Sequence, residues 1–315
     1  MSVDCEPLIS IITVLEDVNM IPLVKENYKN IKYENKQIII VDDGEINNIS
    51  KFLDIENCLY LHLNQEEKEG LFKKIREADK NPSKEDITYS ELCNKLPMGF
   101  KRDYGCGFSD GKYMLHMNCD CIYNAKTIDR KLRLLKNSGS ECLYCDTVLC
   151  YDIYGKELYK SKSETNIYES TLFHTAEFWK RRGFNWSECE NEGKYFHYNN
   201  GVDKLMDNYY DTVQLLTINN MNMYNPIRVK LNNMKIDIPD CVSEINIKDH
   251  PMKLLIDRIF KSNGKILGIN SEFLDNVELP EHNVRNIVEK WKQTKLARVI
   301  GCLLYTSPSP RDWLQ

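Results

Sequence analysis

The chain has 315 residues, of which 42% are apolar and 28% are charged, proportions typical of a folded globular protein. Its formal net charge of -5 comes from 47 acidic and 42 basic side chains mixed along the chain, which excludes an overall basic surface for nucleic acid. No apolar run approaches the roughly 18 residues of a membrane span, and residues 1–7 lack the regions of a signal peptide. We therefore expect a cytoplasmic protein with no nucleic-acid partner and no transmembrane segment.

Apolar runs alternate with helical patterns in the first part of the chain. Residues 8–14 form a continuous apolar run, typical of a strand covered on both faces, and Pro22 then suits the first turn of a helix. Residues 37–41 and 58–63 predict two further strands, and apolar residues recur at helical spacing over residues 46–53 between them. This alternation predicts an α/β fold with a doubly wound, mostly parallel sheet and helices on both faces.

The middle of the chain first departs from this pattern and then returns to it. Residues 64–98 are rich in charge and predict a surface excursion or a loosely packed helix pair, to which the sequence assigns no chemistry. Residues 101–109 lead through glycines into a short buried strand, which ends in an acidic residue at Asp120. Residues 125–137 predict a helix because their apolar side chains share one helical face.

The second half predicts fewer regular elements. Residues 141–152 predict one long strand, residues 171–182 an aromatic-rich helix, and residues 212–218 a last strand. Beyond residue 226 the pattern weakens into an extension with helical stretches. These changes predict an α/β domain over residues 1–225 that contains a charged insertion over 64–98. An extension over 226–300 and a tail over 301–315 are expected to follow it.

The tail has a separate origin in our interpretation. The segment from Cys302 to Asp312 resembles translated sequencing-adapter read-through, and it follows the end of an expected helix without turn residues of its own. We therefore expect residues 301–315 to be non-native and the natural C-terminus to be missing.

The 12 cysteines predict buried thiols. Cys142, Cys145 and Cys150 lie inside an apolar run, where a small hydrophobic side chain is more typical than a disulfide. Cys142 and Cys145 have the spacing of half a zinc site, but no second pair with that spacing follows.

Acidic residues at two strand ends suggest a binding site. Asp42 and Asp43 follow an apolar strand, a position that fits a solvated turn as well as an acceptor for a base or a ribose. Asp120 ends a second strand, and Lys101 and Arg102 stand between the two. A nucleoside diphosphate needs polar acceptors, an oxygen-bound divalent metal and a cation, which these residues can supply.

The order of these motifs resembles that of the family 2 glycosyltransferases with the GT-A fold. Ile38 to Gly44 ends in V-D-D-G, and Lys101 to Gly111 matches the family's K-R-N-x-G-x-x-x-A-x-G except for Asp in place of Asn and Ser in place of Ala. Asn118-x-Asp120 stands at the D-x-D motif, and Thr171 to Phe196 looks like the acceptor-side segment. The resemblance covers about Pro7 to Asn225 and implies the GT-A fold.

The resemblance also implies roles for the nucleotide-binding residues. Asp42 or Asp43 would hold the nucleoside of a nucleotide-sugar donor, and Lys101 and Arg102 would lie near its diphosphate. Asp120, with Asn118, would hold Mn²⁺ or Mg²⁺.

Glu192 would be the catalytic base that deprotonates the acceptor, a hydroxyl of a glycan, a protein or a lipid. Transfer in one in-line displacement would invert the sugar carbon. Without the resemblance, Glu188 and Glu190 are equal candidates for the base.

Departures from the family pattern keep other functions open. Asn118 replaces the first acid of D-x-D, and Cys119 and Cys121 stand where related sequences often carry acids. The alternative hypothesis is therefore a catalytically weak or inactive GT-A-like domain that binds nucleotide or glycan. A third, nucleotidyl transfer onto a sugar phosphate, would need a glycine-rich loop after the first strand, and residues 15–20 contain no glycine.

Three histidines have no role in the resemblance. We interpret His116 as a strand residue packed beside Tyr113, and a polar role near the acceptor stays open for His174 and His197.

Overall fold

The structure is a computed structural model. It describes residues 6–78, 90, 94–153, 156–163, 167–189, 192–193, 196, 204–207, 211–216, 227–231, 236 and 238–244. The chain divides into two compact units, Met1–Leu215 with Ile227–Ile245, and Leu216–Pro226 with Asn246–Gln315. Apart from Leu216, every described residue belongs to the first unit, so the helical stretches expected beyond residue 250 and the tail lie outside the described part of the chain.

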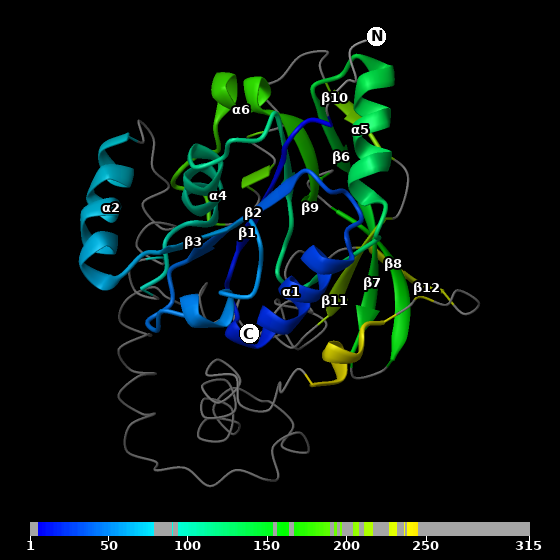
Figure 1. Ribbon diagram of the computed structural model, residues 1–315, viewed down its shortest axis with the longest axis horizontal. Helices are drawn as coiled ribbons and strands as arrows, with labels where there is room; N and C mark the ends of the chain where they lie inside the picture. Colours follow the sequence, from blue (N-terminus) through cyan, green and yellow to red (C-terminus); the bar gives the residue numbers. More distant parts are fainter. Residues whose placement is uncertain are drawn as a thin grey trace, which may run out of the picture. The chain divides into compact units, whose positions relative to one another are not determined.

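A seven-stranded sheet with the order β10-β6-β9-β4-β1-β2-β3 forms the centre of the first unit (Figure 1). Its strands are β1 (Ile9–Val14), β2 (Lys36–Asp42), β3 (Cys58–His62), β4 (Tyr113–His116), β6 (Cys142–Cys145), β9 (Tyr168–Thr175) and β10 (Lys204–Met206). β1 pairs in parallel with β2 and β4, β3 is parallel to β2, and β10 is parallel to β6. β9 runs antiparallel to both of its neighbours. The carboxyl ends of four adjacent parallel strands, β3, β2, β1 and β4, therefore meet along one edge.

A second sheet of five strands has the order β12-β8-β7-β11-β5. Its strands are β5 (Cys121–Tyr123), β7 (Thr147–Asp152), β8 (Glu157–Lys162), β11 (Thr212–Leu216) and β12 (Ile227–Lys230). The loop over residues 117–120 passes from β4 in the first sheet to β5 in the second. The single strand expected over residues 141–152 is thus wrong, because β6 and β7 belong to different sheets.

Helices cover both faces of the large sheet (Figure 1). They are α1 (Ile21–Asn30), α2 (Gln65–Ala78), α4 (Met98–Gly107), α5 (Thr127–Ser138) and α6 (Ala176–Arg182), with short 3-10 turns η1 (Val18–Met20), η2 (Ile49–Lys51) and η3 (Asp240–Glu244). Neighbouring residues of β1 show the two faces: Ile11 packs in the apolar cluster with α1 and α5, and Ile12 packs in the cluster with α4 and α6. The structure confirms the expected α/β class, with a mostly parallel sheet between helices.

The helix α4 is an element that the sequence did not predict. It lies close against the sheet because residue 105 is glycine: a Cβ there would come within 2.8 Å of Ile12 Cγ2 and 3.1 Å of Val41 Cγ2. Lys101 and Arg102 are two consecutive buried cations near the start of this helix. They lie at the edge where the parallel strands end. The expected simple lead into a strand over residues 101–109 is therefore wrong.

Two expected helices also differ from the structure. Over residues 46–53 only the short turn η2 forms, since Phe52 is the one apolar side chain of this stretch that is buried and Leu53 is 78% exposed. The expected helix over residues 171–182 is a strand, β9, followed by α6. The change occurs at Thr175, whose side chain accepts the Phe178 N–H at 3.0 Å and caps α6.

The charged insertion contributes to the core. Phe72 and Ile75 of α2 pack in an apolar cluster with Val41 of β2. The buried Lys68 donates from Nζ to the main-chain oxygen of Asp43 at 3.0 Å. Of the two alternatives expected here, a surface excursion is wrong for α2, which is a helix, and its packing is not loose because Phe72 and Ile75 are buried and Lys68 holds the main chain at Asp43.

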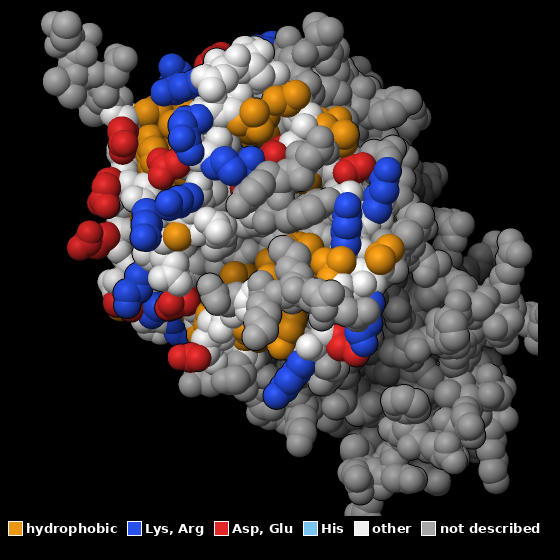
Figure 2. Space-filling model, turned by 90° about the vertical axis from the view of Figure 1, so that its right-hand side faces the viewer, with side chains coloured by type: hydrophobic (Ala, Val, Ile, Leu, Met, Phe, Trp, Pro, Cys, Tyr) orange, Lys and Arg blue, Asp and Glu red, His pale blue; other side chains and the backbone are white. Residues whose placement is uncertain are grey.

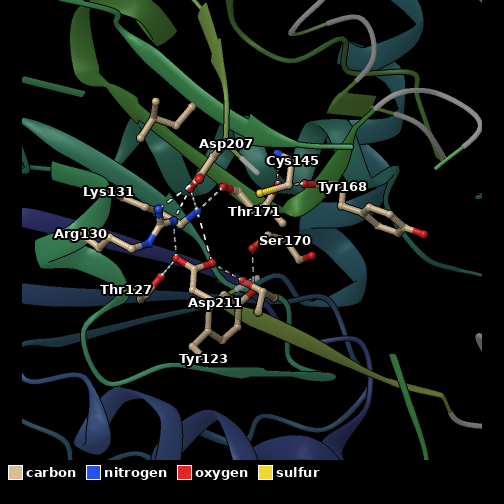
Figure 3. A network of polar contacts seen from close by, with 12 residues as sticks. Tyr123, Thr127, Arg130, Lys131, Cys145, Tyr168, Ser170, Thr171, Asp207 and Asp211 are labelled. Carbon is tan, nitrogen blue, oxygen red and sulfur yellow. Dashed lines mark hydrogen bonds and ion pairs between the residues drawn. The ribbon is translucent and has the colours of Figure 1, made fainter. Parts of the chain in front are cut away.

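A network of charges joins α5 to two later parts of the chain, at Asp207 and Asp211 (Figure 3). Arg130 donates to Asp207 at 3.1 Å and to Asp211 at 2.9 Å, and Lys131 Nζ lies 3.5 Å from Asp211 Oδ1. Thr127 donates to the same Asp211 carboxylate at 2.6 Å. Two cations and two anions thus balance in a place where an unpaired charge would be costly.

The exposed charges are mixed, as the composition predicts. On the face shown in Figure 2, basic side chains lie among acidic ones. Among the described residues, no helix combines the length and apolar character needed to cross a bilayer.

Candidate functional site

Residues from four parts of the chain gather where the parallel strands end. Lys101 and Arg102 come from α4, and each is buried beside carboxylates. The partners of these two cations include three of the predicted site residues, Asp43, Asn118 and Glu192. The structure therefore brings most of the predicted site together around two adjacent cations.

Lys101 forms the first charge centre with Asp43. Its Nζ lies 3.4 Å from Asp43 Oδ1 and 3.9 Å from Glu16 Oε1. The Leu96 N–H also donates to Asp43, at 2.7 Å, and Lys95 Nζ lies 3.5 Å away. Burial alone would raise the pKa of Asp43, but Lys101, Lys95 and the Leu96 N–H together outweigh it and hold that pKa below its usual value.

Asp42 is used inside its own loop. Its carboxylate accepts the Gly44 N–H at 2.8 Å and the Asn48 side-chain amide at 3.2 Å, and it also accepts the Tyr60 hydroxyl. The side chain is 1% exposed. Asp42 therefore shapes the turn after β2 and does not present its oxygens at the surface.

Arg102 forms the second charge centre. Its Nε donates to Glu192 Oε1 at 2.6 Å, and its Nη2 donates to Asn118 Oδ1 at 2.8 Å. Burial alone would lower the pKa of Arg102, but Glu192 outweighs it and raises that pKa. Nη1 is buried and has no hydrogen-bond partner among the described residues. A buried guanidinium with one unused donor is suited to bind an anion.

Glu169 is a site residue that the sequence reasoning missed. It lies on β9, and its Oε1 accepts the Gly193 N–H at 3.2 Å, next to the predicted base. A Cβ at residue 193 would come within 2.7 Å of the Glu169 side chain, so glycine is needed for this approach. Burial first, and the Glu192 carboxylate second, raise the pKa of Glu169 to about 8. The sequence signal for Glu169 was weak: it is the single acidic residue of the β9 sequence, Tyr168–Thr175.

The predicted metal ligands fit a divalent cation only in part. The Asn118 side-chain oxygen already accepts from the Arg102 guanidinium, and a second cation at this oxygen would be repelled. Asp120 is half-buried at the loop between the sheets, with Oδ1 3.6 Å from the Cys121 sulfur. Among the predicted ligands, Asp120 alone offers a carboxylate, the ligand that Mg²⁺ and Mn²⁺ prefer.

Comparisons with known proteins give likenesses in structure alone. No protein-family profile matches the chain, and no curated protein matches its sequence. The crystal structure of S. aureus TarS residues 1–349 is 10% identical, with a TM-score of 0.43, over 97% of this chain and 77% of that one. The complex of the same fragment with UDP-GlcNAc is 11% identical, with a TM-score of 0.42, over 97% and 78%. Likenesses of this size do not establish a shared activity.

Asp103 joins α4 to the segment over residues 179–186. Its Oδ1 accepts the Trp179 indole N–H at 2.7 Å and the Phe184 N–H at 2.9 Å, and its Oδ2 accepts the Trp186 indole N–H at 2.7 Å. Both indoles are thereby fixed in place. Three successive residues of α4, Lys101 to Asp103, thus contact the strand-end Asp43, then Glu192, and then the segment over residues 179–186.

Proposed function

We propose that the chain is a glycosyltransferase that moves a sugar from a nucleotide-sugar donor to a hydroxyl of a glycan, protein or lipid acceptor. The observation that carries this proposal is the buried Arg102 at the carboxyl edge of the parallel strands. Its Nη1 has no hydrogen-bond partner among the described residues. A diphosphate oxygen fits this donor, and Lys101 adds a second positive charge nearby. The order of the sequence motifs, which places these cations between two strand-end acids, supports the same donor class.

The two acids at the carboxyl end of β2, Asp42 and Asp43, take an indirect part in nucleoside binding under this proposal. Asp42 sets the turn after β2, and Asp43 fixes Lys101 and the main chain at Leu96. Both carboxylates are used inside the protein, so they position the wall of the nucleoside site and do not bind the base directly.

Proton transfer falls to the two glutamates beside Arg102. Glu192 is the base that accepts the acceptor's hydroxyl proton, and its carboxylate is paired with Arg102. A donor diphosphate that binds Arg102 weakens this pair and frees Glu192 as the hydroxyl attacks. Glu169 stays protonated at neutral pH because of its raised pKa, which limits the negative charge around the base. A single in-line displacement then inverts the sugar carbon.

A divalent cation, Mn²⁺ or Mg²⁺, remains part of the proposal. Asp120 would hold it together with phosphate oxygens of the donor, and bound there it would neutralise charge on the leaving diphosphate. No other step depends on it. Because the chain offers one predicted carboxylate ligand, metal affinity in the absence of nucleotide is low.

Donor turnover tests the proposal. The purified chain is incubated with a panel of nucleotide-sugars, UDP-GlcNAc among them, with Mn²⁺, and release of nucleoside diphosphate is measured. The expected result is release for at least one donor, reduced roughly 100-fold or more in Arg102→Lys, because one transition-state donor is lost. Equal turnover by wild type and Arg102→Lys would contradict the role of Arg102.

A second candidate function is binding without turnover. The hydrogen bond from Arg102 to Asn118 favours it, because this bond occupies a side chain that the metal site would need. Calorimetric binding of nucleoside diphosphate without release from any nucleotide-sugar would favour this candidate over the enzyme.

A further inference from the structure

Three buried polar side chains that the proposed reaction does not use converge in the core. Cys106 on α4, His116 at the end of β4 and His174 on β9 place one sulfur and two imidazole nitrogens within 4.8 Å of one another. His116 Nε2 lies 2.9 Å from His174 Nε2 and 3.9 Å from Cys106 Sγ. None of the three is more than 1% exposed. Two imidazoles and a thiol are ligands that Zn²⁺ accepts.

The tautomer of His174 leaves its Nε2 available as a metal ligand. Its Nδ1 lies 3.0 Å from the main-chain oxygen of Thr175, and because a carbonyl only accepts, Nδ1 carries the proton. The Nε2 atom is then a bare lone pair that faces His116. Histidines that ligate metals typically donate their other N–H to a carboxylate or a carbonyl in this way.

Without a metal ion, the only hydrogen bond that joins the two rings runs from His116 Nε2–H to the bare Nε2 of His174. The buried Nδ1 of His116 has no partner among the described residues with or without the ion. Phe184 and Phe196 pack against the two rings and keep the surroundings apolar.

We propose that Cys106, His116 and His174 bind one Zn²⁺ ion. Two nitrogens bound to zinc in tetrahedral geometry lie roughly 3.3 Å apart, so the rings need to separate by only a few tenths of an ångström. Binding forms a zinc–sulfur bond and releases the thiol proton of Cys106 to solvent. A water molecule takes the fourth position. The ion joins α4 to β4 and β9, the elements that carry Arg102, the loop to Asn118, and Glu169.

Metal content tests the proposal directly. Tag-free full chain is dialysed with Zn²⁺, then against a chelator, and zinc is measured by mass spectrometry. Wild type is expected to keep about one equivalent, and Cys106→Ser to bind at least about 100-fold more weakly, because a thiolate ligand is lost. The matched control is Cys142→Ser, a buried thiol of the same apolar cluster outside the three ligands, which retains the ion. When Co²⁺ replaces zinc, wild type is expected to show thiolate-to-metal charge-transfer absorption. Cys106→Ser is expected to lack it.

A second measurement on wild type avoids dependence on the folding of variants. Long-range proton–nitrogen NMR of the histidines reports the tautomers, and with Zn²⁺ both rings carry their proton on Nδ1. If wild type keeps no zinc after the chelator step, or if His116 retains a proton on Nε2 in the presence of Zn²⁺, the proposal is overturned. Zinc bound equally by wild type and Cys106→Ser places the ion elsewhere and also overturns it.

Discussion

Arg102 donates from Nε to Glu192 Oε1 at 2.6 Å, and both side chains are buried, with exposures of 3% and 4%. The same guanidinium holds the amide oxygen of Asn118, so it fixes the predicted base and the D-x-D position together. A buried charge pair contributes little net stability when intact, but loss of one partner leaves the other uncompensated. Removal of Arg102 alone is therefore expected to destabilise the fold, whereas removal of both charges should test its role in binding with little loss of stability.

Arg102→Ala is expected to lower the free energy of unfolding by about 3–5 kcal/mol, because Glu192 is left as a buried unpaired charge. The double variant Arg102→Met with Glu192→Leu removes both charges and is expected to recover most of that loss, while donor turnover stays absent. Urea unfolding and nucleotide release measure the two effects. Arg133→Ala, on the exposed side of α5, is the control and should match wild type in both. A double variant no more stable than Arg102→Ala would contradict the pairing argument.

The first three strands were recoverable from the sequence, because strands covered on both faces leave continuous apolar runs. β1, β2 and β3 lie within one or two residues of the predicted ranges. The element β9 was missed for the opposite reason: it is antiparallel between β4 and β6, and its aromatic run fits a helix equally well. Only tertiary pairing distinguishes the two.

The candidate site was predictable at the level of which residues gather, through the order of motifs. The pairing among them was not. That Asp42 is used within its loop follows from Tyr60 and Asn48, which no motif connects to it. The position of Glu169 depends on how β9 packs beside Gly193, a contact between residues 24 apart in sequence.

Glu169→Gln is expected to change how stability depends on pH. The pKa of Glu169 rises from 4.5 to about 8 on folding, chiefly through burial and then through Glu192. Stability from this group is therefore complete below the unfolded pKa and is lost as pH rises towards about 8, since the unfolded chain ionises first. The loss in urea midpoint between about pH 5 and about pH 9 should be smaller in Glu169→Gln than in wild type. Glu34→Gln, at an exposed position, should keep the wild-type loss; an unchanged loss in Glu169→Gln would contradict the shift.

Lys131→Met is expected to destabilise the protein by about 3–5 kcal/mol, because two buried aspartates are left with Arg130 as their main cation. The network in Figure 3 connects α5 to residues 207 and 211, so the loss should appear as earlier urea unfolding. Lys136→Met on the exposed part of the same helix is the matched control, with an expected change within about 0.5 kcal/mol. Similar losses in the two variants would show that the network does not bear on stability.

Asn118→Asp distinguishes the enzyme from the binding domain. The new carboxylate pairs with Arg102 and also offers a second acidic ligand beside Asp120, so Mn²⁺ affinity in the presence of nucleoside diphosphate is expected to rise by about 10-fold or more. If wild type turns over donor, Asn118→Asp should need less Mn²⁺ for half-maximal rate. If wild type binds nucleotide without turnover and Asn118→Asp gains turnover, the chain is a binding domain that has lost a ligand. Asn124→Asp, on an exposed turn after β5, is the control and should leave the Mn²⁺ requirement unchanged. An unaltered Mn²⁺ response in Asn118→Asp would remove this position from the metal site.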